Sequence, residues 1–227
     1  MTYIENLRTY IADGFLYAKN SPNMQPAFRI SYEEIVARRG TIFTTPCGTN
    51  INEFVPFYFS PATGMAYAIH MKRVPLRSTD GDEVCKADPE DVAYIVVDPQ
   101  TLFASGRDCW FTNIACNSAL PPVYEDNPGQ LETHVEWPLF DDTSRMGHIP
   151  EIGYQGVCRW QHDQDDPPER QQRSKKRMAE FMVKDYLRMD EVSCIILKNA
   201  KRAGEVRAWV DDAGAAIPVY VKPGCYY

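Results

Sequence analysis

Residues 168–186 read PERQQRSKKRMAEFMVKDY. A proline and a glutamate open the stretch, as at many helix N-termini, and its interior contains neither glycine nor proline. Its apolar side chains recur at helical spacing: Met178, Phe181, Met182 and Tyr186. The sequence therefore predicts one amphipathic helix over residues 168–186, which packs against the core through this apolar stripe.

Glu180 interrupts the stripe, because it lies between Met178 and Phe181 on or beside the face that should meet the core. An unpaired carboxylate is costly at such a place. One explanation puts Glu180 at the edge of the stripe, in an ion pair with Lys176 or Arg177 that is worth only about a few tenths of a kcal/mol. The other holds the carboxylate at the floor of a cleft, where it takes part in chemistry. Spacing alone leaves both explanations open.

The composition favours a single domain over residues 1–227. Of the 227 residues, 44% are hydrophobic, which is enough to build one sizeable core. No apolar run approaches the roughly 20 residues of a membrane-spanning helix. The N-terminus also leads into polar residues rather than a basic and apolar leader. These features predict a cytoplasmic protein.

The net charge argues against a general affinity for nucleic acid, and the spacing of cysteines and histidines argues against disulfide scaffolds and metal sites. The net charge is −7, so any affinity for nucleic acid must come from a local basic patch. The seven cysteines, an odd number without a CxxC pair, argue against a disulfide scaffold and against a zinc knuckle. The four histidines show no HxxxH spacing, so no metal is expected.

Short helices and strands follow one another irregularly along the chain. We expect helices over 4–12, 31–40, 65–71, 99–104, 168–186 and 199–211, and strands over 15–17, 54–59, 92–97, 110–113, 192–197 and 217–221. Residues 73–91 are charged and contain glycine, so they are expected to form a surface loop. No glycine-rich phosphate loop occurs. Without regular alternation of strand and helix, the pattern predicts an α+β fold.

Residues 118–168 carry few regular signals, because prolines and glycines interrupt them. Their aromatic residues, among them Trp137, Tyr154 and Trp160, are too many for plain disorder. A long irregular insertion in a compact domain is usually functional. We therefore expect an ordered binding loop that leads into the stretch with Glu180.

Basic side chains crowd the end of this loop and the stretch that follows it: Arg159, Arg170, Arg173, Lys175, Lys176 and Arg177. Tyr154 and Trp160 are interleaved with them. Cations for the backbone together with aromatic faces for stacking are typical of surfaces that bind single-stranded DNA. A solvated, charged helix face would give the same pattern, so the residues alone leave both interpretations open.

Several separated segments together resemble one family, the DarT toxins, which are bacterial NAD-dependent ADP-ribosyltransferases that modify bases of single-stranded DNA. The similar segments are residues 2–7 (TYIENL), 35–39 (IVARR), 54–61 (FVPFYFSP) with Met65 and Tyr67, 110–113 (WFTN), 177–181 (RMAEF) and the closing Tyr226 and Tyr227. The resemblance covers most of the chain. The pairing of FVPFYFSP with RMAEF is its most specific part.

The resemblance implies an ADP-ribosyltransferase-like fold with a mixed or antiparallel β core, flanking helices and a substrate loop at about residues 118–168. By resemblance, Glu180 is the catalytic glutamate, and Arg39 reaches the NAD phosphates and the reacting centre. The residues implied in cofactor binding are Thr2, Asn6, Arg39, Tyr58, Met65 and Tyr67, with Tyr58, Met65 and Tyr67 lining the nicotinamide pocket.

The resemblance also implies partners. The residues expected to contact single-stranded DNA are Tyr154, Arg159, Trp160, Arg173, Lys175 and Lys176. A toxin of this family implies a neutralising partner, which would be a macrodomain antitoxin able to remove the modification. NAD serves as co-substrate, and no metal is required. The base that is modified, thymine or guanine in the family, is set by the shape of the pocket.

The expected chemistry fits these residue types. Breaking the bond between nicotinamide and ribose develops positive charge on the ribose carbon, and a fixed carboxylate stabilises that charge in the transition state. Glu180 can also take a proton from the attacking base nitrogen, a role worth roughly 10²–10⁴ in rate. Arg39 can hold the pyrophosphate through charge-assisted hydrogen bonds and so position the sugar.

One departure from the family pattern concerns the N-terminus. The family has a histidine two places before the threonine matched by Thr2, and that position falls before Met1; Tyr3 stands where a second histidine is common. A binding module on the same fold, impaired in catalysis, is therefore a second hypothesis. A third keeps the transferase activity but directs it to protein or RNA.

Overall fold

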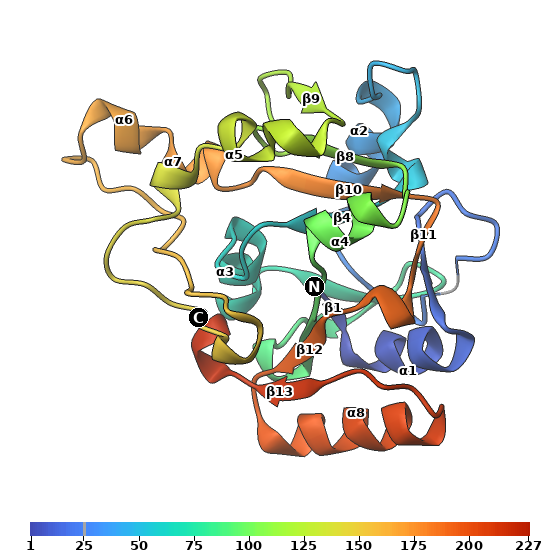
Figure 1. Ribbon diagram of the computed structural model, residues 1–227. Helices are drawn as coiled ribbons and strands as arrows, with labels where there is room; N and C mark the ends of the chain where they lie inside the picture. Colours follow the sequence, from blue (N-terminus) through green and yellow to red (C-terminus); the bar gives the residue numbers. More distant parts are fainter. Residues whose placement is uncertain (25) are drawn as a thin grey trace.

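Two four-stranded sheets organise the computed structural model, which describes residues 1–24 and 26–227 (Figure 1). Within the described residues their strand orders are β1-β7-β12-β13 and β4-β10-β8-β9. The strands are β1 Thr2–Tyr3, β7 Val92–Val96, β12 Cys194–Leu197 and β13 Val219–Val221, then β4 Phe54–Tyr58, β10 Glu180–Lys184, β8 Cys109–Thr112 and β9 Tyr124–Glu125. The strands β12 and β13 run parallel, whereas the other pairs are antiparallel. This arrangement confirms the expected α+β class with a mixed β core.

Helices surround the two sheets. Their bounds are α1 Ile4–Asp13, α2 Glu33–Ile42, α3 Gly64–His70, α4 Pro99–Ala104, α5 Leu131–His134, α6 Pro168–Gln171, α7 Arg173–Lys176 and α8 Ala200–Asp212. The predictions for α1, α3, α4 and α8 are confirmed to within about two residues at each end. Helix α1 ends because Gly14 adopts φ 76°, a left-handed conformation that glycine accepts without strain. Helix α2 continues through Gly40, which we expected to end it.

The predicted helix over residues 168–186 is wrong. The chain forms two short helices, α6 and α7, and then the strand β10. Phe181 and Val183 face the main hydrophobic core, while Met182 faces a second cluster on the other side of the sheet. A strand buried on both faces reads as a continuous apolar run, and such a run also matches a buried helix. The helical spacing of these side chains was therefore not diagnostic.

The expected loop over residues 73–91 is also wrong in part. It contains β5 (Pro75–Ser78) and β6 (Glu83–Lys86), which form a hairpin and pair with β3 (Phe28–Ile30). Every residue of β6 is exposed. A strand without a buried face carries no alternation of apolar and polar residues, so its sequence looks like that of a charged loop. A further small sheet pairs β2 (Phe15–Tyr17) with β11 (Tyr186–Arg188).

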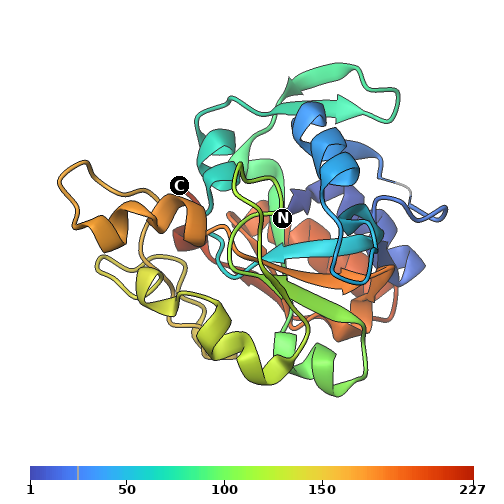
Figure 2. The same cartoon turned by 90° about the horizontal axis from the view of Figure 1, so that it is seen from above.

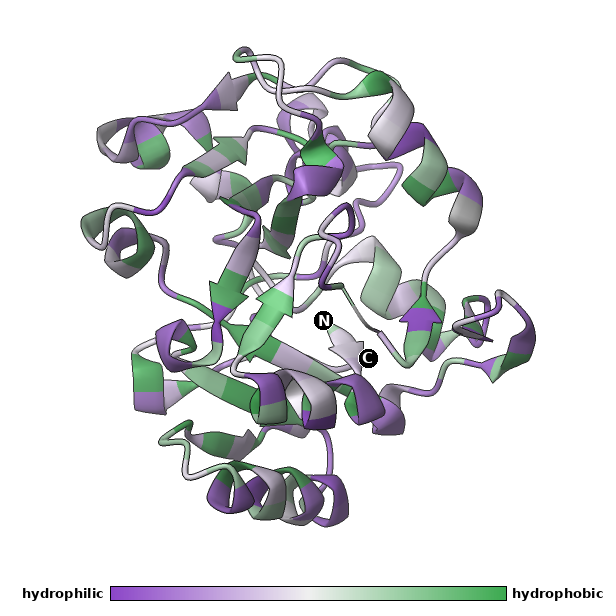
Figure 3. Cartoon of the chain, turned by 90° about the vertical axis from the view of Figure 1, so that its right-hand side faces the viewer, coloured by the Kyte–Doolittle hydropathy of each residue, from purple (hydrophilic) through white to green (hydrophobic). Residues whose placement is uncertain are grey.

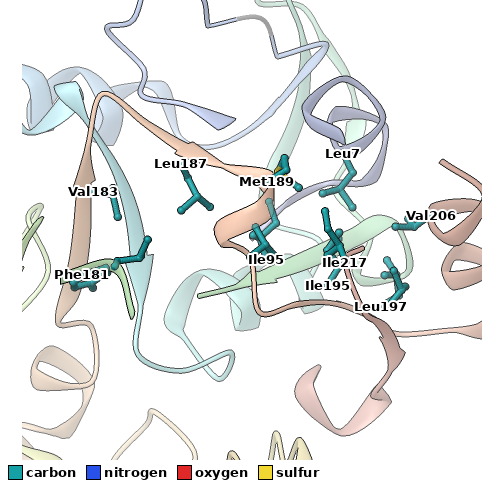
Figure 4. Close-up of a cluster of buried hydrophobic side chains, with 14 of the residues drawn as sticks. Leu7, Ile95, Phe181, Val183, Leu187, Met189, Ile195, Leu197, Val206 and Ile217 are labelled. Atoms are coloured by element: carbon teal, nitrogen blue, oxygen red, sulfur yellow. The ribbon is translucent and has the colours of Figure 1, made fainter. Parts of the chain in front are cut away.

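The main hydrophobic core joins the two large sheets to helices α1 and α8 (Figures 1 and 4). Figure 4 shows Leu7 of α1 and Val206 of α8 next to Ile195 of β12, and Phe181 with Val183 on β10. In Figure 3 the central strands are mostly hydrophobic, and hydrophilic residues are frequent on the helices and loops around them. The burial of β10 fixes the position of Glu180, its first residue.

Residues 118–168 are ordered and contain β9, α5 and short 3-10 turns such as Trp137–Leu139 and Pro150–Ile152. Figures 1 and 2 show this segment alongside α6 and α7. The expectation of an ordered segment is confirmed. In the described part of the chain, no helix is long and apolar enough to cross a membrane.

Candidate active site

Glu180 and Arg39 form a bidentate ion pair, although they lie 141 residues apart in the sequence. Arg39 Nη1 donates to Glu180 Oε1 at 2.7 Å, and Arg39 Nη2 donates to Oε2 at 2.8 Å. Helix α2 supplies the arginine and strand β10 supplies the glutamate. The Glu180 side chain is 1% exposed and that of Arg39 is 12% exposed. The structure therefore brings together the two residues expected to carry the chemistry.

A side chain at the end of β8 and a main-chain group of the loop that follows fix Glu180 further. The backbone N–H of Cys116 donates to Glu180 Oε1 at 2.8 Å, and the backbone N–H of Glu180 donates to Thr112 Oγ1 at 3.1 Å. The ordinary explanation, an ion pair with Lys176 or Arg177 at the edge of a helix, is wrong. Lys176 pairs with Glu136 at 2.5 Å, and Arg177 hydrogen-bonds elsewhere.

The surroundings of Glu180 keep Arg39 charged and keep the neighbouring Tyr58 and Cys116 neutral. Burial disfavours the charge on Arg39, but the charge and hydrogen bonds of Glu180 outweigh that effect and raise the pKa of Arg39. Burial, with the Glu180 charge, raises the pKa of Tyr58 and raises that of the Cys116 thiol to about 12. The thiol next to the carboxylate is therefore protonated at neutral pH and is a poor nucleophile.

Tyr58 lies directly opposite Glu180 in the ladder between β4 and β10. A turn leads from β4 to α3, where Thr63 caps the helix by accepting the backbone N–H of Ala66 at 3.1 Å. Tyr67 on α3 contacts the rings of Trp160 and Tyr227, with centroids 6.1 and 5.4 Å away. Tyr58 is thus placed at the carboxylate, and Tyr67 is placed where the end of residues 118–168 meets α3.

Thr2, Asn6 and Met65 have largely internal contacts. The Asn6 side chain donates to Phe28 O at 2.8 Å and accepts from Phe28 N–H at 2.9 Å, so it ties α1 to β3. Its amide also donates to Thr2 Oγ1 at 3.4 Å. Met65 packs at the border of a buried cluster around Ile69 and Tyr94. Asn6 is 3% exposed, and its side-chain hydrogen bonds hold α1 against β3.

Of the residues expected to contact DNA, some are held by contacts inside the protein and others are exposed at the surface. Arg173 is 3% exposed and its guanidinium is held by Asp142 at 2.5 Å and by the Gln161 carbonyl at 3.2 Å, which does not fit a DNA contact. Lys176 is paired with Glu136, and the Tyr154 hydroxyl donates to Phe59 O at 3.4 Å. Arg159 and Lys175 are exposed, and Trp160 is half-buried. Only part of the expected basic patch is available at the surface.

Comparison with known proteins identifies the family. The model of the family described as ssDNA thymidine ADP-ribosyltransferase, DarT, matches residues 1–227. The chain belongs to the DarT family. Its relatives include a DNA ADP-ribosyl transferase of Thermus sp. (strain 2.9), 27% identical over 187 residues that cover 81% of this chain and 72% of the relative. Another DNA ADP-ribosyl transferase, from Thermus aquaticus, is 22% identical and covers 100% of this chain and 87% of its own.

Solved DarT structures share the fold. Thermus sp. 2.9 DarT in complex with ADP-ribosylated ssDNA matches with a TM-score of 0.76 at 23% identity, over 100% of this chain and 93% of its own. The same protein in complex with NAD+ gives 0.72 at 20% identity, over 100% and 94%. Thermosipho africanus DarTG in complex with ADP-ribose gives 0.63 at 16% identity, over 100% of this chain and 50% of that one. These matches confirm the expected ADP-ribosyltransferase-like fold.

Sequence reasoning missed several groups that shape this DarT site. Cys116 acts through its main chain, and no side-chain pattern signals such a role. Thr112 lies in the WFTN segment, whose resemblance to the family could have pointed to it. The sequence analysis did not predict that its hydroxyl accepts the Glu180 N–H. Arg177 was assigned to the basic surface, whereas it is fully buried.

A cavity in the described part of this DarT chain lies away from Glu180. It measures about 560 Å³ and is lined by Phe15 and Tyr17 of β2, the segment that follows β2, Glu53 just before β4, and Asp185 with Tyr186 at the start of β11. Among the described residues, no cluster of three or more His, Cys, Asp or Glu side chains could hold a metal ion.

Proposed function

We propose that Glu180 and Arg39 are the catalytic pair with which this DarT family member transfers ADP-ribose from NAD to thymine in single-stranded DNA. The bidentate contact between them carries the proposal, because two residues matched to the family's catalytic positions meet in one buried place. The match of the family model over the whole chain supports the substrate class and the target base.

In the proposed reaction the bond between nicotinamide and the ribose carbon breaks, and nicotinamide leaves with the electron pair. Positive charge develops on the ribose carbon, and the Glu180 carboxylate stabilises it in the transition state. A nitrogen of the base forms the new bond to that carbon, and its proton passes to the carboxylate or to water. The Cys116 N–H holds one carboxylate oxygen in a fixed position throughout.

Arg39 has two roles in this proposal. It orients Glu180 through two N–H donors, one from each terminal nitrogen. A guanidinium has five N–H donors, so three remain for the pyrophosphate of NAD. Positioning the phosphates positions the ribose, which is a large part of what an enzyme contributes to a transfer reaction.

The cofactor pocket is proposed to extend from Glu180 towards α3. Tyr58 lies opposite Glu180, and Met65 and Tyr67 follow on α3, so these three would line the nicotinamide side. Thr2 and Asn6 would contact NAD from the N-terminal end of α1. Because the Asn6 amide already bonds Phe28, we assign it chiefly to holding that end in place.

The DNA strand is proposed to bind along residues 118–168 and the start of the following segment, within a single domain over residues 1–227. Arg159 and Lys175 are exposed and suit phosphate contacts, and the half-buried Trp160 suits stacking. Tyr154 packs against two buried clusters, so only the part of its ring that stays accessible could stack on a base. Lys176 could exchange its pair with Glu136 for a phosphate. Arg173 is left out, because Asp142 holds it in the interior.

The biological setting is proposed by similarity. A DarTG structure, Thermosipho africanus DarTG in complex with ADP-ribose, shares the fold. We propose that this chain is the toxin of a toxin–antitoxin pair, that its antitoxin is a macrodomain protein able to remove the modification, and that it acts in the cytoplasm, where DNA and NAD are both present.

Mass spectrometry of a mixed-sequence single-stranded oligonucleotide, incubated with the protein and NAD, tests the proposed function. The expected result is the mass gain of one ADP-ribosyl group, located on thymine by fragmentation. Parallel reactions with guanine-only DNA, RNA and a denatured protein identify other targets. Retention of the oligonucleotide without any mass gain would indicate a binding module instead.

A further inference from the structure

Arg177 is a fully buried arginine that forms no ion pair with a carboxylate among the described residues. Its exposed fraction is 0%, and none of the ion pairs formed by the described residues involves it. Buried arginines are usually paired with an acid, because an uncompensated charge in the interior is costly. Arg177 directly follows α7 and precedes the catalytic candidate Glu180 by three positions.

The guanidinium of Arg177 connects two segments that are distant in the sequence. Its Nη1 donates to the carbonyls of Cys158 at 2.6 Å and Arg159 at 3.1 Å, near the end of residues 118–168. Its Nη2 donates to Ser60 Oγ at 2.9 Å and to the Ala62 carbonyl at 3.4 Å, in the turn between β4 and α3. One side chain therefore holds the loop end against the turn.

The ring of Phe140 completes this environment. The Arg177 Cζ lies 4.6 Å from the ring centroid, within the range of a cation–π interaction. Burial lowers the pKa of Arg177 from its usual value, while the neighbouring Cys158 and Tyr154 act in the opposite direction. Carbonyl dipoles, a hydroxyl and an aromatic face thus take the place of a counter-ion.

The two segments that Arg177 joins carry both halves of the proposed site. Trp160 directly follows the loop carbonyls that accept from Arg177, and its ring lies over Gly64, where an added Cβ would meet it at 3.7 Å. The Trp160 ring also contacts Tyr67 on α3. The proposed DNA-stacking residue and the proposed cofactor residue are therefore held together beside this guanidinium.

We propose that Arg177 is a positioning residue that fixes the end of the substrate loop against the β4–α3 turn, so that the target strand and NAD are held in register. This inference rests on the proposed function for its kinetic consequence. Its structural consequence, an anchored loop end at Cys158 and Arg159, does not depend on catalysis. The two can therefore be tested separately.

The variant Arg177→Lys tests the inference, because lysine keeps the charge but carries its donors on one nitrogen and cannot hold both segments in the same way. We expect trypsin to cleave the folded variant after Arg159 about tenfold faster than the original protein, since the carbonyl there loses its anchor. We also expect KM for the oligonucleotide to rise about tenfold while the Kd for NAD, measured by calorimetry, changes less than about threefold.

Two further variants keep the test decisive. Phe140→Leu retains a buried apolar side chain but removes the ring, so it should shift the same two quantities in the same direction by a smaller factor. It serves where Arg177→Lys does not fold. Arg8→Lys, on the exposed face of α1, is the matched control and should change neither quantity.

Equal rates of cleavage after Arg159 and equal oligonucleotide KM in a folded Arg177→Lys protein would overturn the inference. A parallel rise in the Kd for NAD would show a general structural role instead, which also contradicts it. Faster cleavage in the variant together with no transfer by the original protein would leave the anchor in place and reject the proposed function.

Discussion

The Arg39–Glu180 contact buries two opposite charges that neutralise each other. Removing one of them therefore costs more free energy of unfolding than removing both. Removing one partner of a buried pair costs about 3–5 kcal/mol, because the other charge stays behind in the interior. The Arg39 side chain keeps 12% of its exposure, so water can still reach it. The cost of removing the Glu180 charge should therefore fall at the lower end of that range.

Glu180→Gln is expected to abolish transfer and to reduce stability. Glutamine keeps an oxygen for the Cys116 N–H, but it neither stabilises positive charge nor takes a proton. We expect the rate of oligonucleotide modification, followed by mass spectrometry, to fall by at least ~10²–10⁴. The exposed Glu34→Gln on α2 is the control. A rate within about tenfold of the original would remove Glu180 from the mechanism.

The double variant Arg39→Gln with Glu180→Gln separates stability from catalysis. With both charges gone, no unpaired charge remains in the interior. The free energy of unfolding, measured with urea, should therefore be higher in the double variant than in Glu180→Gln alone. Activity should stay absent. A double variant that is as unstable as the sum of the two single changes would mean that the charges do not interact in solution.

Cys116→Ala is expected to leave transfer almost unchanged, because Cys116 contributes its main-chain N–H to Glu180 and alanine keeps that group. The protonated thiol adds only a weak contact to the Tyr124 hydroxyl at 3.9 Å. We expect kcat within about threefold of the original and a stability loss of about 1 kcal/mol. A loss of activity with the fold retained would indicate a role for the sulfur.

At the scale of elements, the placement of Glu180 depends on the strand β10 and its pairing with β8. The Thr112 hydroxyl accepts the Glu180 N–H and donates to the Ile114 carbonyl at 2.7 Å, both in the interior. Thr112 is 0% exposed, so water cannot replace it. This hydroxyl joins the start of β10 to the loop that carries the Cys116 N–H.

Thr112→Val should therefore loosen the catalytic carboxylate while it keeps the size of the side chain. Two buried polar groups lose their partner, which costs about 1–3 kcal/mol for each. We expect a lower melting temperature and a lower kcat, with KM for NAD less affected. Thr101→Val is the matched control and should keep kcat unchanged, because Thr101 is exposed in the first turn of α4 and its hydroxyl donates to the cap residue Asp98. An unaltered kcat in a destabilised Thr112→Val protein would contradict the positioning role.

Elements with one clear periodicity could be predicted from the sequence, and β10 could not. Helix α1 has an apolar stripe and a glycine stop, and the apolar run of β7 is followed by Asp98 and Pro99, which open α4. Residues 168–186 instead mix a basic helical segment with a strand buried on both faces, and their apolar spacing fits either structure. These residues form a strand because β10 is paired and buried between β4 and β8, which are distant in the sequence.

The candidate site was predicted only in part, for a related reason. The resemblance to the family singled out Glu180 and Arg39, and the structure brings them into contact. Nothing local in the sequence indicates that Arg173 and Arg177 turn inward while Lys175 stays outside. Which side of a short irregular segment faces the core is set by neighbours that are remote in the chain, here Asp142 and Cys158.

At the scale of the whole molecule, DNA binding has to overcome a net charge of −7. Much of the basic patch is neutralised internally, since Arg170 and Arg173 both pair with Asp142 and Lys176 pairs with Glu136. Arg159 is exposed in a surface pair with Asp163, which contributes little and can give way to a phosphate. Lys175 is exposed and takes part in none of the ion pairs of the described residues.

These charges predict a weak dependence of DNA affinity on salt. Each phosphate contact to a single strand contributes about 0.7 to the slope of log K against log salt, so contacts from Arg159 and Lys175 predict a slope of about −1.4. Fluorescence anisotropy of a labelled oligonucleotide at several salt concentrations measures this slope.

Lys175→Gln should make the slope shallower by about 0.7. Lys201→Gln on the exposed face of α8, across the molecule in Figure 1, should leave it unchanged. A steep slope would mean that Lys176 and the other paired cations open to the strand, and an unchanged slope in Lys175→Gln would place the DNA elsewhere.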